Sequence, residues 1–160
     1  MSAEAAVWEA LARVPDPELP VLSLVDLGVV LDVEVDGARA RVRLTPTFVG
    51  CPAVDAMRTA IEHELRVLGY EPLVETTFAV PWTSNRISPL GRERLAEAGI
   101  APPGDAPPTG PVRRPLPLVV ACPRCGGTST RRDNAFGPTP CRSLWYCESC
   151  TEPFEAFKPL

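Results

Sequence analysis

At the junction between a predicted strand and a predicted helix the chain reads Leu44-Thr45-Pro46-Thr47-Phe48-Val49-Gly50-Cys51-Pro52. Pro52 suits the first turn of a helix, where its missing N–H needs no partner, and this places Cys51 at the N-cap. The unpaired N–H groups of a helix N-terminus favour the thiolate form of a cysteine. The stretch therefore predicts a thiol that binds a metal or attacks an electrophile. A small buried side chain is the alternative for a lone cysteine.

A β-hairpin is expected directly before this stretch. Residues 27–35 and 38–44 alternate apolar and polar side chains, and Asp36-Gly37 between them is typical of a two-residue turn. This turn predicts the pairs Val33 with Ala40, Leu31 with Val42 and Val29 with Leu44 on the core side, and Glu34 with Arg39 and Asp32 with Arg41 on the other. Because opposite charges then face each other, the arginines are interpreted as a solvated sheet face.

The spacing of apolar residues elsewhere in the first 100 residues predicts the other helices and strands of a small domain. It predicts a short helix at residues 3–14, an amphipathic helix at 52–68, a third strand at 73–80 and a helix at 90–98. A strand-helix-strand unit makes the second and third strands parallel. We therefore expect an α+β fold with a small mixed sheet and covering helices. Trp82 is interpreted as a residue at the edge of the core, or else as the wall of a pocket.

Proline marks the boundary of this domain. Of the 20 prolines in 160 residues, seven lie between residues 101 and 117, where large apolar side chains are almost absent. Such a composition is typical of a semi-rigid linker. The sequence thus predicts a first domain at residues 1–100, a linker at 101–117 and a second domain at 118–160.

Charge and hydropathy limit the possible binding partners and cellular location of the protein. Residues 1–100 carry nine Arg and fifteen Asp or Glu, and residues 118–160 carry five basic and four acidic side chains. Neither part has the basic stripe that nucleic-acid binding requires. No secretory signal and no apolar run of about 20 residues is evident. We expect a cytoplasmic protein that binds neither nucleic acid nor membrane, and in that reducing setting paired cysteines indicate metal or redox chemistry.

Two Cys-x-x-Cys pairs near the end of the chain are typical of a metal site. Each pair allows one tight turn to aim two sulfurs at one ion, and two such turns complete the four-thiolate set of a structural zinc ribbon. The predicted ligands are Cys122, Cys125, Cys147 and Cys150. Iron also suits four thiolates, and Cys141 is left as a strand residue or a spare thiol. Because so small a domain buries little apolar area, we expect the metal to form its core, surrounded by Phe136, Leu144, Trp145, Phe154 and Phe157.

The sequence lacks the residues for ordinary nucleophilic catalysis. His63 is the only histidine, and twelve residues of helix separate it from Cys51 by about 18 Å. A cysteine-histidine pair needs a separation of roughly 3 Å. Glycine-rich phosphate-binding motifs are also missing. A non-catalytic role for Cys51 is therefore expected.

The first 100 residues resemble the SufT-like iron-sulfur assembly domain. The residues that carry the resemblance are Asp16-Pro17-Glu18-Leu19-Pro20, Ser23, Asp26-Leu27-Gly28, Thr45-Pro46-Thr47, Gly50-Cys51-Pro52, Trp82-Thr83, Ile87-Ser88 and Gly91. The resemblance implies that Cys51 is the ligand that transfers a cluster. It also implies that Asp26, Thr45 and Thr47 shape the pocket of this cysteine.

The last 40 residues are similar to the tail of the PaaD family, accessory subunits encoded with phenylacetyl-CoA epoxidase. The matching residues are Cys122 to Gly126, Phe136-Gly137, Cys141, Cys147 to Cys150 and Thr151 to Lys158. This resemblance implies a maturation factor in phenylacetate degradation, with the iron-sulfur reductase and the di-iron oxygenase as partners. The implied cofactors are structural zinc and a transient iron-sulfur cluster or iron. Since one thiol cannot hold a cluster, a partner's ligands or a homodimer bridged by two Cys51 thiolates would complete the site.

Two other classes of function remain open. A binding module would use an aromatic-rich zinc ribbon to dock on the epoxidase as a scaffold, and Cys51 would only pack. A thiol enzyme would react quickly with an alkylating reagent and turn over a thioester or disulfide. The single histidine argues against this second class.

Overall fold

The computed structural model describes residues 2–105 and 119–160, which form two compact units. The first unit comprises Met1–Trp82 and Arg86–Ser88, and the second comprises Thr83–Asn85 and Pro89–Leu160. Most of the predicted linker lies outside the described residues. The predicted domains 1–100 and 118–160 stay predictions, although residues 89–101 group with the second unit in the structure.

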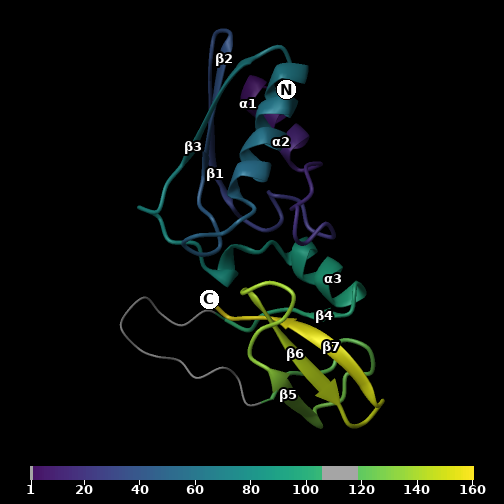
Figure 1. Cartoon of the computed structure of the whole chain (residues 1–160). Coiled ribbons are helices and arrows are strands. Elements are labelled where there is room, and N and C mark those ends of the chain that lie inside the picture. Colours follow the sequence, from purple (N-terminus) through teal and green to yellow (C-terminus); the bar gives the residue numbers. More distant parts are fainter. Residues whose placement is uncertain (1, 106–118) are drawn as a thin grey trace. The chain divides into compact units, whose positions relative to one another are not determined.

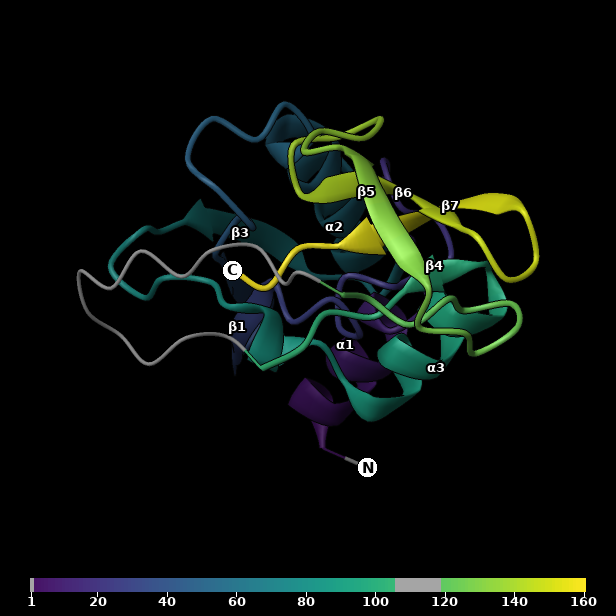
Figure 2. The same cartoon turned by 90° about the horizontal axis from the view of Figure 1, so that it is seen from below.

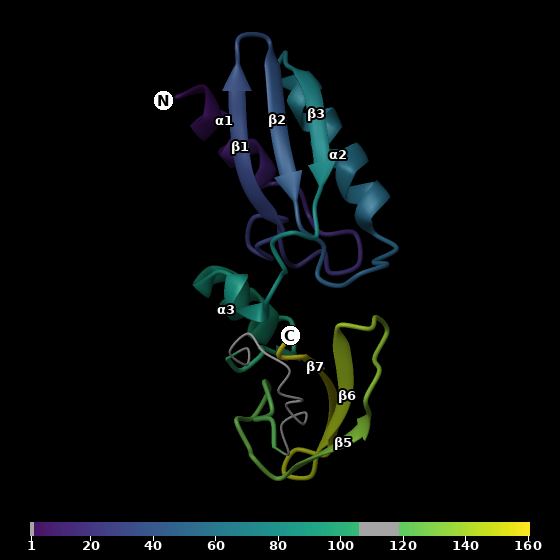
Figure 3. The ribbon, with the colours of Figure 1, turned by 90° about the vertical axis from the view of Figure 1, so that its left-hand side faces the viewer.

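The first unit is a three-stranded mixed sheet with two helices on one face (Figures 1 and 3). Its elements are α1 (Ala3–Leu11), β1 (Val30–Asp36), β2 (Arg39–Leu44), α2 (Val54–Val67) and β3 (Glu71–Thr76). Strand β2 lies in the centre, antiparallel to β1 and parallel to β3. The predicted α+β class and the parallel strand pair are confirmed. The helices cover the sheet because their apolar stripes, including Leu11, Ile61 and Leu65, are fully buried.

The register of the hairpin differs from the prediction by two residues. Val33 pairs with Val42 and Glu34 pairs with Arg41, so Gly37 and Ala38 form the turn instead of Asp36 and Gly37. A bulge between Val30 and Asp32 ends the regular pairing. Each side chain of the hairpin still lies on its predicted face of the sheet, because a register shift of two residues preserves the alternation of side chains.

Ion pairs cover the exposed face of this sheet. Arg41 donates to Glu34 at 3.0 Å and to Glu75 on β3 at 2.7 Å, and Arg43 pairs with Asp32. The two glutamates raise the pKa of Arg41, Glu75 more than Glu34. The interpretation of this face as a solvated one agrees with these exposures and contacts.

The second unit is built around a four-stranded sheet. Its elements are α3 (Pro89–Glu97), β4 (Ile100–Ala101), β5 (Thr130–Asn134), β6 (Arg142–Cys147) and β7 (Glu152–Phe157), and a short 3₁₀ helix, η1 (Ser84–Arg86), begins in this unit. The strand order is β4-β7-β6-β5, and β5, β6 and β7 lie side by side as antiparallel neighbours (Figures 1 and 2). The core contains Trp145 and Phe154 but not Phe136, which is 64% exposed. The predicted place of Phe136 around the metal is therefore wrong; its ring lies under the Lys158 ammonium group.

Candidate functional site

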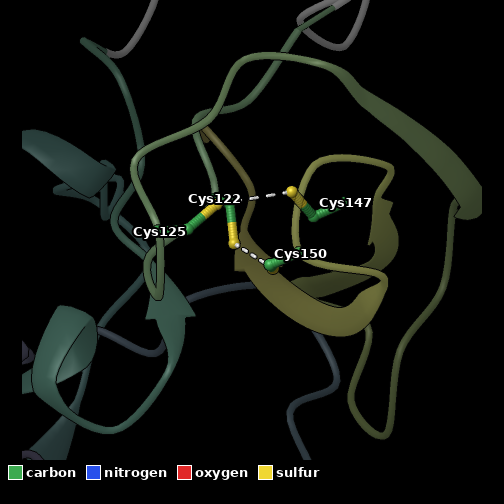
Figure 4. A group of neighbouring side chains, drawn as sticks. All are labelled: Cys122, Cys125, Cys147 and Cys150. Carbon is green, nitrogen blue, oxygen red and sulfur yellow. Dashed lines mark hydrogen bonds between the residues drawn. The ribbon is translucent and has the colours of Figure 1, made fainter.

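Four cysteines of the second unit gather at one point (Figure 4). Cys122 and Cys125 come from the turn before β5, and Cys147 and Cys150 come from the end of β6 and the turn after it. Their sulfur atoms all lie within 4.8 Å of one another. The structure thus brings together the four residues that were predicted as metal ligands, and Cys141 lies outside this group.

Tight turns aim the sulfur atoms. The backbone N–H of Gly126 donates to the carbonyl of Cys122 at 2.9 Å, and Gly126 has a φ of 73°, which favours glycine. The N–H of Gly127 donates to Cys125 Sγ at 3.4 Å. This contact fixes the position of the Cys125 sulfur within the turn.

The spacing of the sulfur atoms fits a tetrahedral zinc site. Cys122 Sγ lies 3.8 Å from Cys150 Sγ, and Cys125 Sγ lies 3.6 Å from Cys147 Sγ. Four sulfurs bonded to one zinc ion at about 2.3 Å would be about 3.8 Å apart. All six cysteines of the chain lie within the described residues, and none of them forms a disulfide there. The donor set is therefore suited to a single zinc ion held by four thiolates.

The pKa values of two thiols in this cluster, Cys147 and Cys150, are shifted in opposite directions. Hydrogen bonding from the backbone N–H of Cys150 lowers the pKa of Cys147 to about 6. Burial raises the pKa of Cys150 to about 12. A metal ion supplies the positive charge that lets both ionise, so metal binding releases protons.

Cys51 does not cap a helix. Helix α2 begins at Val54 with Ala53 as its N-cap, and Pro52 lies in the turn before it. Instead, the N–H of Cys51 donates to Phe48 at 3.3 Å, and its carbonyl accepts from Val54 at 3.4 Å. The predicted helix-capping position is wrong because a turn of 3₁₀ type separates the cysteine from the helix.

The Cys51 side chain is 8% exposed, between the exposed residues Gly50 and Pro52. Its loop leaves the carboxyl end of β2, next to the carboxyl end of the parallel strand β3. The two loops are joined, because Thr45 Oγ1 donates to the carbonyl of Val80 at 2.7 Å. The thiol is thus set back from the surface, in a loop at the end of two parallel strands.

Asp26 and Thr45 hold loops together instead of facing solvent. Both oxygens of Asp26 accept hydrogen bonds at 2.9 Å, from the hydroxyl groups of Ser23 and Ser88. Thr45 is 1% exposed, and its hydroxyl binds Val80 as described. Thr47 is half-buried in the loop before Cys51. The roles of these residues in a Cys51 pocket stay predictions.

Three residues that carried the family resemblance have structural roles that their spacing alone did not reveal. Ser23 and Ser88 donate to Asp26, and the indole N–H of Trp82 donates to the carbonyl of Leu27 at 2.9 Å. Trp82 is 6% exposed, as expected for the edge of the core. A polar pattern such as Ser-x-x-Asp could have indicated the first contact, because it is typical of a local side-chain turn.

Two family models match the chain. Residues 4–72 match the family described as iron-sulfur cluster assembly protein, and residues 107–158 match the PaaD zinc beta ribbon domain. A protein of Escherichia coli (strain K12), named as a subunit of 1,2-phenylacetyl-CoA epoxidase, is 39% identical over 153 residues, which cover 95% of this chain and 90% of that protein. The chain belongs to the PaaD family of phenylacetyl-CoA epoxidase subunits. Family membership also agrees with a zinc ribbon at the four cysteines.

Solved structures are similar to part of this PaaD family chain. A domain of unknown function from Bacillus anthracis is 30% identical, with a TM-score of 0.49, and covers 57% of this chain and 90% of its own. A conserved hypothetical protein from Thermotoga maritima is 33% identical, with a TM-score of 0.48, and covers 59% of this chain and 94% of its own.

Within residues 2–105 and 119–160, no helix has the length and apolar composition needed to cross a bilayer.

Proposed function

We propose that this PaaD family member is a non-catalytic accessory factor of phenylacetyl-CoA epoxidase. It helps assemble an iron-sulfur cluster, or deliver a cluster or iron, to the iron-sulfur reductase or the di-iron oxygenase component. The observation that carries the proposal is the match of residues 4–72 to the iron-sulfur cluster assembly family, in the same chain as a ribbon typical of the PaaD family. The match includes Asp26, Thr45, Thr47 and Cys51.

In this proposal Cys51 is the ligand that receives and releases the cargo. Its loop lies where two parallel strands end, the position at which α/β sheets commonly bind ligands. Because the side chain is only 8% exposed, the loop must move before the sulfur can reach a cluster. One thiolate offers a single bond, so a ligand from a client protein or a second copy of the chain completes the site.

The ribbon has a structural part in the same proposal. Cys122, Cys125, Cys147 and Cys150 would hold one zinc ion, which supplies the cross-link between the two turns. No step of delivery passes through this ion. The cytoplasmic location expected from the sequence and a division of the chain into two domains are part of the proposal as well.

Replacement of Cys51 tests delivery directly, and Cys141 provides a matched control because it is also buried and outside the metal site. The reductase is produced together with wild-type chain, Cys51→Ser or Cys141→Ser. Its iron and labile sulfide content should fall about tenfold with Cys51→Ser and stay unchanged with Cys141→Ser. Zinc should remain at one equivalent in all three proteins. Full cluster loading with Cys51→Ser would remove the proposed role of this residue.

A scaffold without cargo is the second candidate function, and the burial of Cys51 favours it. A scaffold would bind the epoxidase components through its surface and would need no reactive thiol. Anaerobic incubation of the purified chain with iron and sulfide separates the two functions. A carrier should gain visible absorption that Cys51→Ser lacks, whereas a scaffold should stay colourless and still co-purify with the epoxidase.

A further inference from the structure

Strand β4 belongs to the sheet of the zinc ribbon although it precedes Cys122, the first cysteine of the metal site. Ile100 pairs with Glu155 and Ala101 pairs with Ala156, parallel to β7. Ala101 is 2% exposed and packs in one hydrophobic cluster with two of the metal-site cysteines, Cys122 and Cys147. A residue from the predicted linker is therefore part of the interior that surrounds the metal site.

The turn that holds Cys122 and Cys125 also lies beside the connection between α3 and β4. Arg124 lies between Cys122 and Cys125, and its Nη2 atom would be 3.8 Å from a Cβ atom placed on Gly99. Gly99 follows the end of α3 and has a φ of 78°. A side chain added at Gly99 would therefore reach the guanidinium group, which lies beside this turn. A cavity of about 400 Å³ has Ala98, Gly99, Arg124 and Trp145 among its lining residues.

Further hydrogen bonds fix α3 within the same unit. Arg92 of α3 donates to the carbonyl groups of Ser84 and Pro103. Ser84 precedes α3 in the sequence, and Pro103 follows β4. Ser84 is fully buried, and its N–H donates to the carbonyl of Leu160 at 2.9 Å. Hydrogen bonds thereby hold both ends of the segment from Ser84 to Pro103, and Ser84 is also bound to Leu160, beyond the end of β7.

We propose that α3 and β4 form a positioning element for the four-cysteine site. The element completes the sheet and interior against which Cys122 and Cys147 are packed, so it raises the affinity of the site for metal. By thermodynamic linkage, metal binding must stabilise α3 and β4 to the same extent. The metal-dependent folding unit is then the whole second unit, including α3 and β4, which precede the matched ribbon at 107–158. This inference needs only that the four cysteines bind a metal, and it does not depend on cluster delivery.

A pair of glutamate substitutions tests the positioning role. Ala101→Glu places a charge in the interior of the sheet, whereas Ala98→Glu makes the same change on an exposed residue three positions earlier. Zinc affinity of the full chain is measured by competition with a chromophoric chelator. Ala101→Glu should weaken zinc binding by about tenfold or more, and Ala98→Glu should stay within about twofold of the wild type. Equal affinities of the two variants would overturn the proposal.

Amide hydrogen exchange on the unaltered chain provides a second test that requires no variant to fold. Removal of zinc with a chelator should accelerate exchange about tenfold or more at Ala98 and Gly99, whose N–H groups donate to Arg94 and Ala96. The amide of Thr45 in the first unit, which donates to Val29, should keep its rate. Faster exchange in β6 and β7 with no change at Ala98 and Gly99 would contradict the inference, because the ribbon would then lose order without α3 and β4.

Discussion

The two units reach a packed interior by different routes. In the first unit, aliphatic side chains such as Leu11, Ile61 and Leu65 are fully buried between the helices and the sheet. In the second unit, Cys122 and Cys147 are themselves part of the hydrophobic cluster. Four thiolates packed together repel one another unless they share a positive ion. The comparison leads us to expect that apolar burial stabilises the first unit and that metal coordination contributes much of the stability of the second.

Loss of one metal ligand should give the largest effect. Cys147→Ser removes a ligand that is 0% exposed, so we expect the second unit to unfold while the first stays folded. Nuclear magnetic resonance spectra of the full chain can follow both units in one sample. Resonances of β6 and β7 should lose their dispersion, and those of β2 and α2 should not move. Cys141→Ser should leave both sets of resonances unchanged. Loss of dispersion in both units of Cys147→Ser would contradict the view that only the second unit depends on the metal.

A substitution that creates a cavity in the first unit should destabilise that unit and leave the second unit unaffected. Ile61→Ala removes a fully buried side chain of α2 and should lower the free energy of unfolding of this unit by about 3 kcal/mol. Denaturant titration, followed by helix signal, measures the loss. Val67→Ala on the same helix, where the side chain is 67% exposed, should change stability by about 0.5 kcal/mol or less. Zinc affinity should be the same in both variants, and weaker binding in Ile61→Ala would show that the units are not independent.

A smaller loss is expected from a backbone change in the loop that holds Asp26. Gly28 has a φ of 73°, and a Cβ atom there would lie 2.4 Å from the carbonyl oxygen of Arg86. Gly28→Ala should therefore destabilise the first unit by about 2 kcal/mol. Gly37→Ala is the matched control, because Gly37 has a φ of 55° but open space around it. Thermal unfolding that shifts equally in both variants would refute the effect of the close contact.

The smallest effect is expected on the exposed face of the first sheet. Arg41→Ala removes ion pairs to Glu34 and Glu75 that are open to solvent. Exposed pairs contribute little and are screened by salt. The melting temperature of the first unit should fall slightly at low ionic strength, and the difference from the wild type should vanish at high ionic strength. A difference that persists in high salt would indicate packing by the arginine stem.

The spacing of residues was sufficient to predict the metal site but not the hairpin register. Two residues between paired cysteines constrain the sulfur positions directly, so Cys122, Cys125, Cys147 and Cys150 converge as expected. In the hairpin, acidic and basic residues both repeat every second position. A shift of two therefore keeps opposite charges together, and Glu34 faces Arg41 instead of Arg39. Charge pairing could not select between these registers.

Local sequence patterns could determine neither the start of α2 nor the existence of β4. Pro52 is compatible with the first turn of a helix and with the turn that actually precedes Ala53, so local propensity did not decide between them. Ile100 and Ala101 form a strand only because β7, more than 50 residues later, offers an edge for pairing. No periodicity of two residues can reveal such a partner.

The pairing of Ile100 and Ala101 with β7 has a practical consequence for protein engineering. A zinc ribbon grafted onto another protein from residue 107 or 118 onward would carry its four cysteines but would leave the β7 edge bare. Bare strand edges promote association between chains. A transplant should therefore carry the segment from Ser84 through Pro103 as an integral part of the cassette.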